Sequence, residues 1–145
     1  IVVKKHDYRA SYEAVRKNAT DFPSHNVTAA WWGDAWHVAV GARPLPAELL
    51  VGAESGLVSA YPAESELRML AERVRDLSYG TNLWGSARYR RQISAPLAIQ
   101  AVRRAAGIEL SAALAADLEL VETPKFAMEA PEVRHVPGMD SQEVR

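Results

Sequence analysis

The stretch that decides the fold is VTAAWWGDAWHVAVG, residues 27–41. Gly33-Asp34 at its centre fits a two-residue β-hairpin turn, because glycine tolerates a positive φ without steric cost. Counting outward from this turn pairs Trp31 with Trp36. One face of the hairpin then carries six apolar side chains, Val27, Ala29, Trp31, Trp36, Val38 and Val40. The other face is less apolar, with Thr28, Ala30, Trp32, His37 and Ala39. We therefore expect the first face to join the core.

Helical spacing of apolar residues predicts helices before and after this hairpin. The first runs from Asp7 to about Ala19, with a buried stripe of Tyr8, Tyr12, Val15 and Ala19. The second begins near Pro62 and ends at Gly80, with a stripe of Leu67, Leu70, Val74 and Leu77. The third begins at Ser94 or Ala95, with Pro96 in its first turn, and Gly107 ends it.

The remaining segments give weaker patterns. Residues 1–3 predict a short strand, and 43–46 a proline-containing linker. Residues 47–60 are ambiguous, since 47–51 could form a helical turn and Leu57-Val58 a short strand. Residues 111–118 fit a short helix and 118–122 a closing strand. Residues 124–145 have no helical or strand period, and three prolines interrupt them.

These patterns together predict an α+β fold. A small antiparallel sheet includes the 27–41 hairpin, and three or four helices pack on one of its faces. Residues 1–123 form a single domain, and 124–145 form an extended C-terminal arm. The chain length of 145 residues suits one domain.

The charge is unevenly distributed along the chain, although the net charge is only -1. Residues 86–104 contain five arginines and no acid, whereas 105–145 contain eight acidic and three basic residues. A basic segment followed by an acidic one can bind its own neighbour, a second copy or a polyanion.

No motif predicts a reaction, a metal site or a cofactor. The chain has no cysteine, which excludes disulfides and thiol chemistry. Its four histidines lack the spacings of metal ligands, and no phosphate-binding or nucleophile motif is present. At the hairpin, Asp34 and His37 could form an acid–base pair, and Trp32 is the one tryptophan of the hairpin expected to be exposed. Turn formation by Asp34 and strand packing of His37 are the favoured explanation of these residues.

The arginine-rich segment is the best candidate contact surface. Its residues are Trp84, Arg88, Tyr89, Arg90, Arg91, Arg103 and Arg104. Arginines would meet phosphates and the rings could stack on bases. Alternatively, Arg103 and Arg104 only stabilise a helix C-terminus, and the other arginines pair with the acidic arm.

We therefore expect a non-enzymatic assembly or adaptor subunit of a larger complex, for example a phage-particle component. It would contact neighbours through the arm and the arginine patch, as a homo-oligomer or with other protein subunits. The alternative is a nucleic-acid-associated regulatory protein using the same arginines, and a small enzyme using Asp34 and His37 ranks last. No apolar run reaches the roughly 18 residues of a membrane span, so we expect a cytoplasmic or virion protein without membrane contact.

Overall fold

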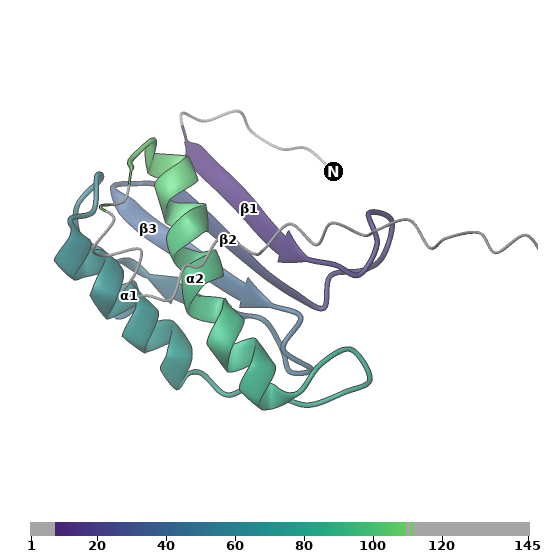
Figure 1. The fold of residues 1–145 in the computed structure, drawn as a ribbon. Coiled ribbons are helices and arrows are strands. Elements are labelled where there is room, and N and C mark those ends of the chain that lie inside the picture. The colour runs from purple at the N-terminus through teal and green to yellow at the C-terminus, as the bar shows by residue number, and fades with distance from the viewer. Residues whose placement is uncertain (1–7, 110, 112–145) are drawn as a thin grey trace, which may run out of the picture.

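The computed structural model describes residues 8–109 and 111. Four strands form one antiparallel sheet in chain order, β1 (Arg9–Val15), β2 (His25–Trp32), β3 (Ala35–Gly41) and β4 (Glu48–Val51). A short 3₁₀ helix, η1 (Gly52–Ser55), follows β4. Helices α1 (Glu64–Asp76) and α2 (Ala87–Ala106) then lie side by side across one face of the sheet (Figure 1). The α+β class is confirmed.

The hairpin of β2 and β3 has the predicted register. Trp31 lies opposite Trp36 and Ala29 opposite Val38. Gly33 and Asp34 have φ of 58° and 60°, as a type I′ turn requires. The face expected to be apolar points to the helices, and the core side chains that it contributes are Val27, Ala29, Trp36, Val38 and Val40.

The helices close the core with two different surfaces. The predicted stripe of α1 is buried at Leu67, Leu70 and Val74. Helix α2 instead buries a face made mostly of alanine, consisting of Ala95, Ala98, Ala101, Ala105 and Ala106 beside Ile99 and Val102. Small side chains let two helices and a sheet approach closely, which is how this short chain fills its interior.

The helix predicted after Asp7 is wrong, because residues 9–15 form strand β1. Its residues pair with β2 from Arg9 opposite Trp31 to Val15 opposite His25. Side chains alternate along the strand, so the Glu13 carboxylate points to α2 and accepts a 2.7 Å hydrogen bond from Arg104. The neighbouring Tyr12 points the other way. Strand pairing thus overrides the local helical spacing.

The predicted start of the last helix is also wrong. Helix α2 begins seven residues before Ser94, at Ala87, because the Ser86 hydroxyl caps it by accepting a 3.1 Å bond from the Tyr89 N–H. Pro96 therefore lies inside the helix. The helix ends as predicted at Gly107, whose φ is 69°.

Other predictions have mixed outcomes. The helical turn predicted at 47–51 is wrong, because residues 48–51 form strand β4, and the short strand predicted at Leu57-Val58 is not formed. Two α-helices are present in the described range, against the three or four expected. The predicted elements at 1–3, 111–118 and 118–122, and the arm at 124–145, lie outside the described residues. No helix in residues 8–109 is long and apolar enough to cross a membrane.

Candidate functional site

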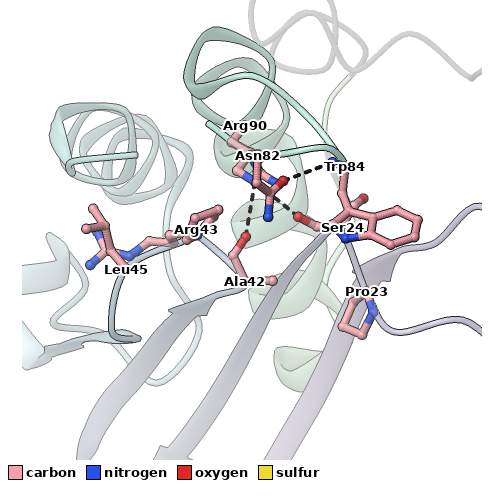
Figure 2. A pocket seen from close by; sticks show the side chains of 9 residues that line it. Pro23, Ser24, Ala42, Arg43, Leu45, Asn82, Trp84 and Arg90 are labelled. Atoms are coloured by element: carbon pink, nitrogen blue, oxygen red, sulfur yellow. Dashed lines mark hydrogen bonds between the residues drawn. The ribbon is translucent and has the colours of Figure 1, made fainter. Parts of the chain in front are cut away.

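Three loops meet at the end of the sheet opposite the hairpin turn, and we call this the loop end. They are residues 16–24, 42–47 and 77–86. Between them lies an open pocket of about 250 Å³, with Arg90 at its base and Trp84 at its rim (Figure 2). Its lining is completed by Pro23, Ser24, Ala42, Arg43, Pro44, Leu45 and Asn82.

Arg90 ties the three loops together. Its side chain is 1% exposed and donates only to neutral acceptors. Nε lies 3.2 Å from Ser24 O and 3.1 Å from Ala42 O. Nη1 donates to the carbonyls of Gly80 and Gly85, and Nη2 donates to Asn82 Oδ1 at 2.6 Å. No carboxylate of the described chain compensates the charge, so the loop end is electropositive.

A second buried guanidinium, that of Arg43, holds the neighbouring loop. It donates to Pro46 O at 2.7 Å, to Ser78 O at 2.7 Å and to the Glu48 carboxylate at 3.0 Å. The preceding residue, Ala42, has φ of 53°, a left-handed conformation that disfavours side chains. The two arginines therefore hold this loop in a shape that its own backbone would not favour.

Gly80 is needed where the loops approach each other. Its N–H donates to Arg43 O at 2.7 Å. A Cβ at position 80 would lie 3.1 Å from that same oxygen and 3.1 Å from the Pro44 side chain. Gly80 was predicted to end the second helix, but α1 stops earlier, at Asp76. Because Gly80 has no side chain, it allows its loop to pack closely against residues 43–44.

Behind the pocket, His25 and Ser94 form a buried polar pair. The Ser94 hydroxyl lies 2.6 Å from His25 Nε2 and 2.6 Å from Arg90 O. Burial, and then the positive charge of Arg90, lower the pKa of His25 from 6.5 to about 4. A histidine beside a serine can serve nucleophilic catalysis. Here both side chains are fully buried, so no substrate can reach them and the pair is structural.

The structure separates the predicted arginine patch into two groups. Trp84 and Arg90 line the pocket, and Arg88, Tyr89 and Arg91 are exposed beside it on the first turns of α2. Thirteen residues further along the helix, a rise of about 20 Å, Arg103 and Arg104 pair with the carboxylates of Glu109 and Glu13. The seven residues therefore lie in two groups along α2, and nucleic-acid binding by either group stays a prediction.

A second candidate surface is the face of the sheet that the helices leave uncovered, which we call the open sheet face. Alternation along the strands places on it Ala10, Tyr12, Ala14, Asn26, Thr28, Ala30, Trp32, Ala35, His37, Ala39, Gly41, Leu49 and Val51. None of these is Asp, Glu, Lys or Arg. Tyr12, Trp32 and Leu49 are 49%, 52% and 54% exposed. Small residues form its centre, and large apolar ones stand at its margins.

The predicted hairpin residues lie at one end of this open sheet face. The Trp32 and His37 rings contact each other, with centroids 5.4 Å apart. Asp34 occupies the turn and makes no hydrogen bond or ion pair with His37. An acid–base pair between Asp34 and His37 is therefore not present, and Trp32 is exposed as expected. No group of three or more metal-ligating side chains lies within residues 8–109.

Comparison with known proteins identifies the fold but not a family. No family model matches the chain, and no curated protein matches it in sequence. Quinoline 2-oxidoreductase from Pseudomonas putida 86 matches with a TM-score of 0.59, 19% identity and 70% of this chain covered. A carbon monoxide dehydrogenase from Hydrogenophaga pseudoflava, which lacks the Mo-pyranopterin moiety of its molybdenum cofactor, has the same TM-score and coverage at 15% identity. The match spans 38% of each of those chains.

Proposed function

We propose that this chain is a non-catalytic docking unit of a larger protein assembly. The observation that carries the proposal is the open sheet face, whose strand residues include no charged side chain and keep three large apolar ones half exposed. The Arg16 guanidinium contacts this face only at the Tyr12 ring. Antiparallel sheets that face water on one side normally alternate apolar and polar residues. An uncharged second face is instead typical of a sheet that packs against another protein surface.

The size of the open sheet face suits one part of an interface. The sheet is three inter-strand spacings wide and its strands are about seven residues long, which gives this face an area of roughly 300 Å². A standard interface buries about 800 Å² on each partner, so the flanking loops must contribute as well. The exposed aromatic side chains Tyr12 and Trp32 are the residue types that dominate interface energies. The alanines between them let a partner approach the backbone closely.

The structural comparisons support a context for this docking unit. The two matching chains described above are named as an oxidoreductase and a dehydrogenase, and this fold accounts for 38% of each. In them the fold is one portion of a larger chain. We therefore propose, as the context of this docking unit, an accessory role in an oxidoreductase assembly, with the reaction carried out elsewhere in that assembly. The phage-particle example and the nucleic-acid alternative stay predictions that none of these findings tests.

A charge placed in the middle of the open sheet face tests the proposal. Ala39 lies between Thr28 and Leu49 on the neighbouring strands. Ala39→Lys is expected to shift the tagged chain, expressed in its native host, from a large complex to the free chain in size-exclusion chromatography. Ala53→Lys, at an exposed position of η1, is the matched control and should leave the complex intact. If both variants elute as the unchanged chain does, the open sheet face is not the docking surface.

A further inference from the structure

The loop end combines exposed apolar side chains with uncompensated positive charge. Phe22 and Leu83 are 97% and 95% exposed, and the Trp84 ring stands beside the pocket (Figure 2). The Lys17 ammonium lies 5.1 Å from the centroid of the Trp84 ring, which joins the first loop to the third. These features mark a contact surface that is separate from the open sheet face.

The cations of the loop end outnumber its carboxylates. In these loops and the turns of helix and strand that adjoin them, the cationic side chains are Arg16, Lys17, Arg43, Arg75, Arg88, Arg90 and Arg91, and the carboxylates are Asp21, Glu48 and Asp76. Arg88 and Arg91 make no hydrogen bond or ion pair within residues 8–109, and both are exposed. Burial is the main cause of the low pKa of His25, and the positive charge of Arg90 lowers this pKa further. An occupant of the loop end must therefore be acidic and partly apolar.

The chain itself contains a segment of this chemistry. Residues 112–145 carry seven acidic and three basic side chains, together with apolar residues that include Phe126 and Met128. Helix α2 separates Ser111 from the loop end by about 30 Å, whereas 34 extended residues reach up to roughly 110 Å. Both charge and length therefore allow this segment to return to the loop end of its own chain.

We propose that residues 112–145 dock on the loop end of the same chain, over the pocket and beside Arg88 and Arg91. The acidic side chains would pair with these two exposed arginines, and the apolar ones would cover Phe22, Leu83 and Trp84. This inference does not rest on the proposed function, because it concerns the opposite end of the sheet from Trp32 and a different occupant.

The absence of cysteine permits a direct test in the full chain. A single Met128→Cys substitution carries a nitroxide label, and the four tryptophan indole N–H signals are followed by NMR. We expect the label to broaden the Trp84 signal, and to affect far less those of Trp31 and Trp36 near the hairpin turn. The effect should disappear in 1 M salt, where the Debye length is about 3 Å.

Matched variants separate the possible outcomes. Arg88→Gln/Arg91→Gln should abolish the broadening, whereas Arg68→Gln/Arg103→Gln, which removes the same charge elsewhere, should keep it. Arg90 is left unchanged because it holds the loops. An unaffected Trp84 signal, or broadening that survives the Arg88/Arg91 substitutions, overturns the proposal. The proposal is also overturned if a nitroxide on a second copy without the isotope label broadens the Trp84 signal of an isotope-labelled chain. The occupant of the loop end would then come from another molecule.

Discussion

Replacing Arg90 should release the three loops that it holds. In Arg90→Met, the carbonyls of Ser24, Ala42 and Gly80 lose the donor that Arg90 supplies. Gly85 O and Asn82 Oδ1 lose the Arg90 bond too, but they keep the N–H groups of Asn82 and Trp84 as donors. Each unsatisfied buried acceptor costs about 1–3 kcal/mol, but removal of an unpaired buried charge offsets part of this cost. Because the pocket admits water to some of these acceptors, we expect a net loss of about 3 kcal/mol in the free energy of unfolding.

A lysine variant separates hydrogen bonding from charge. Arg90→Lys keeps the charge but offers three donors from one nitrogen instead of five in a planar fork. It should therefore lose at least about half of what the methionine variant loses. If the methionine variant does not fold, the lysine variant carries the test alone.

The assay is equilibrium urea unfolding followed by tryptophan fluorescence. Arg91→Met is the matched control, since Arg91 is an exposed neighbour on the same helix, and it should stay within about 0.5 kcal/mol of the unchanged chain. The reasoning is refuted if Arg90→Met and Arg90→Lys also stay within that range. The reasoning is also refuted if Arg90→Lys is as stable as the unchanged chain and Arg90→Met is not. In that case the positive charge of Arg90, and not its hydrogen bonds, would stabilise the loops.

Two further predictions concern buried titratable groups. The pKa of His25 is about 4 in the folded chain and 6.5 in the unfolded chain. Between pH 4 and 6.5 this histidine is therefore protonated in the unfolded chain and neutral in the folded one. Stability should fall with pH from 6.5 to 4, by up to about 1.4 kcal/mol per pH unit and about 3 kcal/mol in total, and His25→Gln should lack this dependence in urea titrations at each pH. The Glu66 carboxylate accepts three backbone N–H groups at 2.8–2.9 Å. Although burial acts to raise its pKa, these bonds hold the pKa below its usual value. The stabilisation that Glu66 provides is therefore present above the pKa of this group in the unfolded chain, and it is lost as the pH falls through the pKa in the folded chain. Glu66→Gln should cost about 1–3 kcal/mol near neutral pH, and a thermal-melting midpoint equal to that of the unchanged chain would contradict this.

The sequence predicts the hairpin well because its signals are local. A two-residue turn fixes the register of residues 27–41, and alternation with period two then assigns each side chain to a face. The same reasoning fails at residues 9–15, where helical spacing and strand alternation both fit. The choice is made there by pairing with residues 25–31, which are distant in sequence. The predicted start of α2 is too late because of Pro96. Proline is favoured in the first turn of a helix, but it is tolerated in the interior of a helix that tertiary packing stabilises.

The candidate site was only partly predictable. Trp84 and Arg90 were singled out because aromatic and arginine residues cluster in that segment, and both line the pocket. The role of Arg90 could not be inferred, because its acceptors come from residues 24, 42, 80, 82 and 85. Arg43 was missed entirely, since a linker arginine gives no local sign that it will bond Ser78. Such long-range contacts appear only once the loops are brought together.

Position-specific photo-crosslinking tests the docking of the open sheet face most directly. A photoreactive phenylalanine replaces Leu49 on that face, or Met69 on the helix layer, and the two side chains are similarly exposed at 54% and 45%. In the native host, the proposed function predicts that the residue at position 49 crosslinks to a component of the proposed oxidoreductase assembly, identified by mass spectrometry, and that the residue at position 69 gives no such product. Equal crosslinking from both positions, or none from position 49, would contradict the account.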